Sequence, residues 1–235
     1  MLIGDRITPK IGILECGAVS APLKSRVPTY TQAFQDFLSP DGSGPILKSY
    51  HCYEGEFPKR CDECDGWLIT GSAASVYDGD KWTDELEAFI RSAALSRPLV
   101  GICFGHQLIA QAFGGTVQKA SSWGIGVHRH ELFGDDAPIS YLELLASHQD
   151  QVTNPPSRAR VLGGSDFCPI GSMTIEKNVL TIQNHPEMTK EFAKDLYNSR
   201  RRRIGENSVG EALGSLNRAT NEADVREWII GFFCR

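Results

Sequence analysis

The chain has 235 residues, of which 41% are hydrophobic, and its formal net charge is -5. This size allows a sizeable buried core, and the negative balance leaves no basic excess for a phosphate backbone, which argues against a nucleic-acid partner. No window approaches 18 apolar residues and the seven scattered cysteines suit a reducing compartment, so we expect a cytoplasmic protein without a membrane span.

The first half of the chain alternates between strand and helix patterns. Short apolar runs at 11–16, 67–70 and 98–103 are each bounded by Gly or Pro, which is typical of buried parallel strands. Between them, 30–38 and 82–95 carry apolar residues at helical spacing. This alternation predicts an α/β fold of the flavodoxin-like kind, a doubly wound and mostly parallel sheet with helices on both faces.

The pattern changes after Gly115. Residues 126–132 and 173–183 alternate between apolar and polar types, the second run around a turn at Lys177 and Asn178, so we predict a small antiparallel hairpin region. From about residue 190 the chain has helical patterns. Because no linker rich in Pro, Gly or Ser interrupts it, we expect a single domain over residues 1–235 with a helical C-terminal extension.

Cys103 stands between Gly101 and Gly105, where a predicted buried strand meets a predicted helix. Glycines on both sides of a nucleophile remove side chains that would clash in a strained strand-to-helix turn. The partial positive charge at the helix N-terminus favours a thiolate at this position. The pentapeptide therefore predicts a reactive cysteine, and the alternative is an ordinary buried core cysteine.

A base and its orienting group occur together as His185-Pro186-Glu187. In an extended segment residues i and i+2 point to the same side, and Pro186 keeps its predecessor out of the helical region. The imidazole and the carboxylate can therefore lie side by side, as a cysteine nucleophile needs. The tripeptide alone is equally compatible with a solvated turn.

Together these segments resemble a known family. Residues 101–107 are similar to the G-x-C-x-G-x-Q signature of class I glutamine amidotransferases, and residues 183–187 are similar to their His-Pro-Glu segment. Residues 70–78 resemble the oxyanion loop in the glutaminase part of GMP synthases, and residues 147–152 resemble their Ser-His-x-Asp segment. The resemblance covers roughly residues 10 to 190.

The resemblance implies a role for each matching residue. Cys103 would be the nucleophile, His185 the general base and acid, and Glu187 the group that orients the histidine. Backbone N-H groups of Gly71 and Phe104 would form the oxyanion hole. The implied cycle needs neither a metal nor an organic cofactor. The α-amino and α-carboxylate groups of the substrate would be held by Gln107, Ser147, His148 and Asp150.

The implied reaction is hydrolysis of the γ-carboxamide of glutamine through a Cys103 thioester, with release of ammonia and glutamate. Because the chain ends about forty residues after the last motif, an ammonia-accepting synthase would be a separate partner. The alternative is a free-standing hydrolase or peptidase for γ-glutamyl amides or peptides. A binding module without activity is a third hypothesis, against which the intact Cys103, His185 and Glu187 argue. Asn184 departs from the aromatic residue that many family members carry there.

Several residues outside these motifs offer other chemistry. His128 and His130 alternate on one strand, as a metal clip would, but nothing in the sequence completes a metal site, so we expect exposed strand residues. His106 lies beside Gln107, and we expect a structural role for it. The run Arg200–Arg203 is interpreted as the solvated end of a helix, with a docking patch for an acidic partner or a nucleotide as the alternative.

Overall fold

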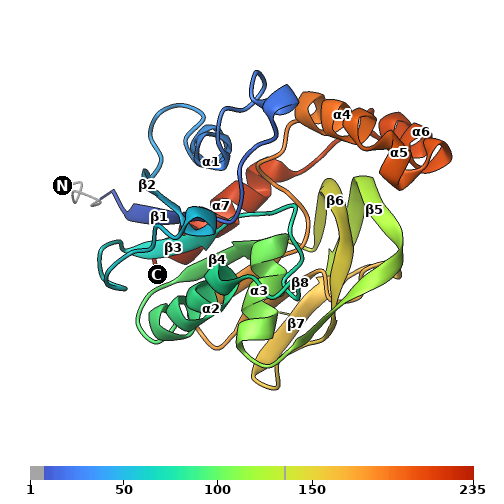
Figure 1. The fold of residues 1–235 in the computed structure, drawn as a ribbon. Coiled ribbons are helices and arrows are strands. Elements are labelled where there is room, and N and C mark those ends of the chain that lie inside the picture. Colours follow the sequence, from blue (N-terminus) through green and yellow to red (C-terminus); the bar gives the residue numbers. More distant parts are fainter. Residues whose placement is uncertain (1–7, 135) are drawn as a thin grey trace, which may run out of the picture.

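A computed structural model describes residues 8–134 and 136–235. A nine-stranded sheet runs through the molecule, with strands hydrogen-bonded in the order β2, β1, β3, β4, β9, β8, β7, β5, β6 (Figure 1). Its strands are β1 (Lys10–Glu15), β2 (Ile46–His51), β3 (Gly66–Ile69), β4 (Leu99–Ile102), β5 (Thr116–Leu132), β6 (Tyr141–Asn154), β7 (Ala159–Gly164), β8 (Ser172–Ile175) and β9 (Val179–Ile182).

The strands from β2 to β9 in this order are parallel. All four residues of β3, β4 and β9 are buried, because helices cover both faces of this part of the sheet. This burial explains why these strands are continuous apolar runs in the sequence. The helices are α1 (Tyr30–Leu38), α2 (Lys81–Ala93), α3 (Phe104–Ala112), α4 (Lys190–Ser199), α5 (Arg201–Ile204), α6 (Glu206–Ser215) and α7 (Glu222–Phe233), with short 3-10 turns η1 (Ala21–Leu23) and η2 (Cys52–Glu54).

Each face of the parallel strands has its own hydrophobic core. Helices α1 and α7 pack on one face, where Phe34 and Ile229 meet Leu68 and Val100. Helices α2 and α3 pack on the other face, where Leu86 and Ile109 join the same cluster as Trp67. The predicted α/β fold with helices on both faces of a doubly wound sheet is therefore confirmed.

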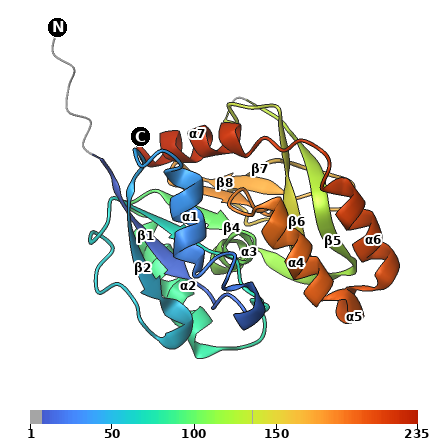
Figure 2. The same ribbon diagram turned by 90° about the horizontal axis from the view of Figure 1, so that it is seen from above.

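The antiparallel part consists of β8, β7, β5 and β6, and the long pair β5 and β6 extends away from the parallel strands (Figure 2). Helices α4 and α6 cover this pair through a third cluster that includes Phe192, Tyr197 and Val209. The Tyr197 hydroxyl donates to the Ala146 carbonyl at 2.6 Å and accepts from the Gly126 amide at 3.1 Å, so it ties α4 to both strands. Helix α4 thereby reaches the edge where β4 and β9 end.

Most predicted elements coincide with observed ones. The structure has a helix over 30–38, as predicted, and β8 and β9 flank the expected turn at Lys177 and Asn178. The antiparallel region, expected to be small, comprises four strands: β5 extends well beyond the alternating segment 126–132, and β6 and β7 were not predicted. Within the described residues, no helix is both long and apolar enough to span a membrane.

Candidate active site

Cys103 occupies the turn between β4 and α3 in a strained backbone conformation. Its φ of 55° and ψ of -103° place it among the rare residues other than glycine with positive φ. Such a conformation costs on the order of 1 to 3 kcal/mol and persists only where the surroundings impose it. Here the Cys103 amide donates to the Ile182 carbonyl at 2.9 Å, and the Cys103 carbonyl accepts from the Gln107 amide at 3.1 Å. The side chain itself is buried, with 4% of its residue surface exposed.

The two glycines around Cys103 are required by close backbone approaches. A Cβ atom on Gly101 would lie 2.6 Å from the Gly105 carbonyl oxygen. A Cβ atom on Gly105 would lie 2.4 Å from the Ile69 carbonyl oxygen. Helix α3 can therefore pack against the ends of β3 and β4 only when both positions lack a side chain. This is the strand-to-helix elbow that the Gly-x-Cys-x-Gly spacing predicts.

His185 and Glu187 follow β9 and form a buried pair. The Nδ1 atom of His185 lies 2.7 Å from Oε1 of Glu187, and the His185 amide donates to the Leu145 carbonyl of β6 at 2.8 Å. Burial alone lowers the pKa of His185, but the negative charges of Glu187 and Cys103 together raise that pKa well above its usual value. A contact between the imidazole and the Cys103 side chain adds to the rise. The charges of Cys103 and Glu187 therefore both act on the imidazole of His185.

Gly71 borders the side chains of Cys103 and His185 from the side of β3. A Cβ atom on Gly71 would lie 2.9 Å from Cε1 of His185 and 3.8 Å from Cβ of Cys103, so its backbone faces both side chains. Two hydrogen bonds fix the loop: the hydroxyl of Thr70 accepts from the Cys16 amide at 3.0 Å, and the hydroxyl of Ser72 donates to the Cys16 carbonyl at 2.6 Å. The Gly71 backbone is therefore held beside the side chains of Cys103 and His185.

The predicted substrate-binding residues gather on the other side of Cys103. Nε2 of Gln107 donates to the Asp150 carbonyl at 2.7 Å, and Nδ1 of His148 lies 3.1 Å from the same oxygen. The Asp150 carboxylate accepts from the hydroxyls of Ser75 (2.6 Å) and Tyr77 (2.7 Å), which joins the 70–78 loop to β6. Sequence reasoning included both donors in this loop but assigned them no role.

Two adjacent pockets share residues beside the site, and Cys103 and His185 line different ones. His185 and Glu187 also line a third pocket, together with Lys190 and Arg226. The cysteine-side pocket is lined by Cys103, Phe104, Gln107 and Asp150, among others. The histidine-side pocket is lined by His185, Glu187 and Gly71, with an apolar wall supplied by η1, α1 and α4. The residues common to both linings are Ser72, Ala73, Ser147 and Arg200.

Arg200 differs from the expectation of a solvated helix end. It stands between α4 and α5, is half-buried, and its Nη1 donates to the hydroxyl of Ser147 at 3.2 Å. Arg203 lines the cysteine-side pocket and places its guanidinium 4.9 Å from the centre of the Trp123 ring. Arg201 instead pairs with Glu206, and Arg202 is exposed. Because the helix breaks at Arg200, the four arginines point in different directions, which the sequence run does not reveal.

His106, His128 and His130 are all at least half-buried, which differs from the exposure expected for His128 and His130. His106 is fully buried on α3 and its Nδ1 lies 2.8 Å from the hydroxyl of Thr181, in keeping with the expected structural role. His130, expected to be exposed, is fully buried against Gly171. A Cβ atom added to Gly171 would lie 2.2 Å from Nδ1 of His130. The neighbouring His128 is half-buried. The prediction fails because β5 pairs on both sides and the hairpin of β7 and β8 covers His130.

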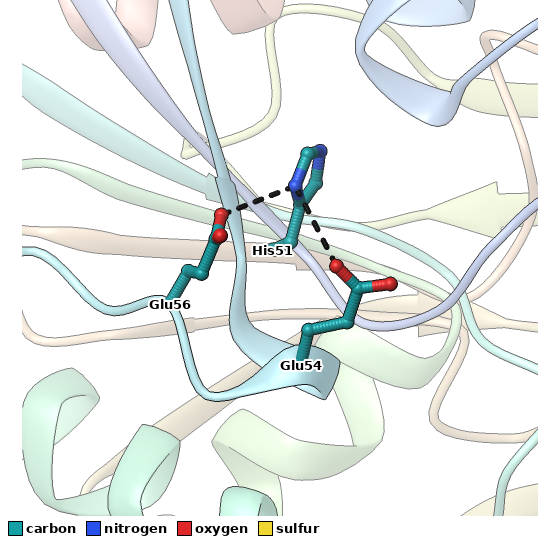
Figure 3. A group of neighbouring side chains, drawn as sticks. All are labelled: His51, Glu54 and Glu56. Carbon is teal, nitrogen blue, oxygen red and sulfur yellow. Dashed lines mark ion pairs between the residues drawn. The ribbon is translucent and has the colours of Figure 1, made fainter.

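A separate group of ligand-type side chains lies at the end of β2 (Figure 3). Nδ1 of His51 is 3.2 Å from Oε2 of Glu56 and 4.0 Å from Oε2 of Glu54. Both carboxylates are mostly exposed, and no further ligand atom among the described residues completes a coordination shell. We interpret the group as a surface ion-pair cluster.

Comparisons with known proteins agree with this geometry. The family profile "Glutamine amidotransferase class-I" matches residues 49–199. The chain is 37% identical over 184 residues to one of the subunits of the glutamine-hydrolyzing GMP synthase of Saccharolobus solfataricus, covering 76% of this chain and 89% of that protein. It is 31% identical over 179 residues to gamma-glutamyl peptidase 2 of Arabidopsis thaliana, covering 71% and 72%.

A solved structure shows the same fold. The crystal structure of a glutamine amidotransferase from Thermotoga maritima superimposes with a TM-score of 0.75 at 16% identity, over 95% of this chain and 98% of that one. At this identity the likeness concerns the fold. With the family profile and the sequence relatives, it establishes that this chain belongs to the class I glutamine amidotransferase family.

Proposed function

We propose that this protein hydrolyses the γ-amide bond of a γ-glutamyl compound through a thioester on Cys103. The observation that carries the proposal is the strained Cys103, whose side chain borders Gly71 together with that of His185, while Nδ1 of His185 lies 2.7 Å from Glu187. A nucleophile, a base and an orienting carboxylate in this order are the parts that acyl transfer needs. Membership of the class I glutamine amidotransferase family supports the same reaction class.

The reaction proceeds in two steps. The Cys103 thiolate attacks the γ-carbonyl carbon, and the negative charge of the tetrahedral intermediate develops on the carbonyl oxygen. The protonated His185 gives its proton to the leaving nitrogen, the C-N bond breaks, and a γ-glutamyl thioester remains. His185 then takes a proton from water, the resulting hydroxide attacks the thioester, and the C-S bond breaks, so that glutamate leaves and the Cys103 thiolate and protonated His185 are restored.

The oxyanion would be held by the backbone N-H groups of Gly71 and Phe104. Phe104 is the first residue of α3, so its N-H has no partner within the helix and points toward the turn at Cys103. Gly71 faces both Cys103 and His185, because a Cβ atom added to it would approach both side chains. One such donor contributes on the order of 2 to 4 kcal/mol to the transition state.

The leaving group is proposed to be an amine larger than ammonia. Because Cys103 lines one pocket and His185 lines the other, the scissile bond would lie at the boundary between the two pockets. The glutamyl part would then occupy the cysteine-side pocket near Gln107 and Asp150, and the leaving nitrogen would face His185. Ammonia needs no pocket there, whereas an apolar wall offers binding energy to an organic substituent. The gamma-glutamyl peptidases among the relatives support this choice.

A second candidate is an ammonia-donating protein that acts with a separate synthase. The similarity to a GMP synthase subunit favours it. Both candidates share every step up to the thioester, so Cys103, His185 and Glu187 do not distinguish them.

The test is a turnover assay of the purified protein with glutamine and with a panel of γ-glutamyl amines and dipeptides, measuring release of glutamate and of the amine. The proposal expects turnover of organic γ-glutamyl amides to exceed that of glutamine. Cys103→Ala removes it, whereas Cys234→Ala, at an exposed cysteine far along the chain, does not. Glutamine turnover that appears only with an added synthase would support the second candidate, and full activity of Cys103→Ala would contradict both.

A further inference from the structure

The boundary between the two pockets contains a cation, Arg200, that forms no ion pair with an Asp or Glu carboxylate among the described residues. Arg200 lines both pockets, and its side-chain hydrogen bond goes to the neutral hydroxyl of Ser147. By contrast, Arg201 pairs with the Glu206 carboxylate a few residues away. Burial lowers the pKa of the Arg200 guanidinium, which nevertheless stays charged because an arginine loses its proton only at very high pH. A half-buried guanidinium with free donors is suited to bind an anion.

Arg200 lies close to the reacting group, because it lines the cysteine-side pocket together with Cys103 and the histidine-side pocket together with His185. Burial raises the pKa of the Tyr30 phenol to about 12, and the charges of Arg200, Glu187 and Cys103 all act on that phenol. Tyr30 also lines the histidine-side pocket, and it keeps its proton at neutral pH. Two hydrogen-bond donors, a guanidinium and a neutral hydroxyl, therefore stand near the position where the scissile nitrogen would lie.

The distribution of cations between the pockets assigns Arg200 to the leaving group. The cysteine-side pocket contains Lys119 and Arg203 in addition to Arg200, so the glutamyl carboxylate has other cations available there. In the histidine-side pocket, Arg200 is the one lysine or arginine among the described lining residues. The Glu187 carboxylate, which also lines this pocket, is paired with His185. An anionic group on the leaving amine would consequently meet Arg200.

We propose that Arg200 selects substrates whose leaving group is an amino acid with a free α-carboxylate, so that the preferred substrate class is γ-glutamyl amino acids with an apolar second residue. This inference rests on the proposed γ-glutamyl hydrolysis. In such a substrate the carboxylate is joined to the carbon next to the scissile nitrogen, within reach of a guanidinium close to Cys103 and His185. The side chain of the second residue of the substrate then contacts the apolar wall of the histidine-side pocket. This wall consists of Leu23, Val27, Ala33, Met188, Phe192 and Leu196.

The experiment compares γ-glutamyl-leucine with γ-glutamyl-leucinamide, which differ only in the charge of the terminal group. For the wild-type protein we expect kcat/KM to be roughly 10- to 100-fold higher for the acid than for the amide. This factor corresponds to the free energy of a charge-assisted hydrogen bond. In Arg200→Met that ratio should fall toward one, mainly through KM. Arg202→Met, at an exposed arginine outside both pockets, is the matched control and should keep the wild-type ratio.

Three results would overturn the inference. A wild-type ratio near one shows that the carboxylate is not recognised. If kcat/KM in Arg200→Met falls equally for the acid and the amide, so that their ratio is kept, Arg200 binds the glutamyl half of the substrate. Retention of the ratio in Arg200→Met with unchanged activity shows that Arg200 does not bind substrate. Arg200→Lys keeps the charge and should retain part of the ratio, which separates recognition from misfolding.

The same assay tests the apolar wall, because γ-glutamyl-leucine should be turned over roughly tenfold or more faster than γ-glutamyl-glycine at low concentration. Equal rates would contradict the preference for an apolar second residue. Failure of the proposed function is recognised separately. If no γ-glutamyl compound is hydrolysed in a Cys103-dependent manner, both proposals fall. If the acid and the amide are both hydrolysed through Cys103 at equal rates, only the role of Arg200 falls.

Discussion

The Nδ1 atom of His185 lies 2.7 Å from Oε1 of Glu187, and the two side chains expose only 8% and 5% of their surface. A carboxylate this close to a buried imidazole stabilises its protonated form, and it also fixes the ring so that the other nitrogen faces Cys103.

Glu187→Gln should reduce kcat by roughly 100- to 10,000-fold, because the amide orients the ring but does not stabilise the imidazolium. The pKa of His185 is raised well above its usual value by Glu187 and Cys103 against the effect of burial, so loss of one negative charge lowers it. The alkaline limb of the pH profile of kcat should therefore move to lower pH. Glu187→Asp keeps the charge and is the matched variant. An unchanged alkaline limb in Glu187→Gln would contradict the coupling.

Gly71→Ala should lower kcat by on the order of 100-fold with little change in the midpoint of thermal unfolding. The added Cβ would lie 2.9 Å from Cε1 of His185, so the ring or the loop must shift. Gly210→Ala is the control, because no atom lies within 4 Å of its added Cβ on α6, and a helical Gly to Ala change stabilises by about 0.5 to 1 kcal/mol. Wild-type kcat in Gly71→Ala would show that this loop does not shape the site.

Tyr197→Phe should reduce the free energy of unfolding by about 1 to 3 kcal/mol, because it leaves both the Ala146 carbonyl and the Gly126 amide without their partner. The change is measured by urea unfolding followed by circular dichroism. Tyr141→Phe retains the ring that stacks under Arg129 and should change stability by less than about 0.5 kcal/mol. Equal stability of the two variants would mean that the hydroxyl does not fasten α4 to β5 and β6.

Stability should fall as the pH drops below about 6.5, the unfolded value for histidine. Burial lowers the pKa of His106 to about 3, of His130 to about 4 and of His148 to about 3, so the unfolded chain binds protons in this range and the folded protein does not. At pH 5 each histidine should cost about 2 kcal/mol of the free energy of unfolding. His185, with its raised pKa, is protonated in the folded protein throughout this range, so it partly opposes the loss of stability above about pH 5.5 and adds little slope below that value.

The measurement is the free energy of unfolding in urea between pH 7 and pH 5. His106→Gln should remove the share of one histidine from the pH dependence, and the amide can keep a hydrogen bond to the hydroxyl of Thr181. A free energy of unfolding that stays constant over this range would contradict neutral burial of these rings.

Local sequence patterns were sufficient to predict those features of the site that depend on residues close together in the chain. Gly101 indicates the elbow because its close approach, to the Gly105 carbonyl, arises within the strand-to-helix turn itself, whereas the contact that requires Gly105 is made with Ile69 of β3. The spacing of His185 and Glu187 likewise indicates their pairing, since an extended segment places i and i+2 on one side.

Features that depend on distant segments were missed. His130 looks exposed in an alternating strand, and only the packing of Gly171 over it makes it buried. Arg200 looks like part of a uniform basic run, but the break between α4 and α5 and the docking of α4 on β6 direct it toward Ser147. The hydrogen bonds from Ser75 and Tyr77 to Asp150 similarly join residues more than 70 positions apart.

The central claim is that Cys103 forms a covalent γ-glutamyl thioester, and trapping that intermediate tests it most directly. The wild-type protein is mixed with a saturating γ-glutamyl amide, quenched in acid within the first turnovers, and analysed by intact-protein and peptide mass spectrometry. We expect a mass increase of one glutamyl group on the peptide that contains Cys103, present in Cys234→Ala and absent in Cys103→Ala. Turnover without any adduct in the first turnovers, or an adduct on another residue, would contradict the account.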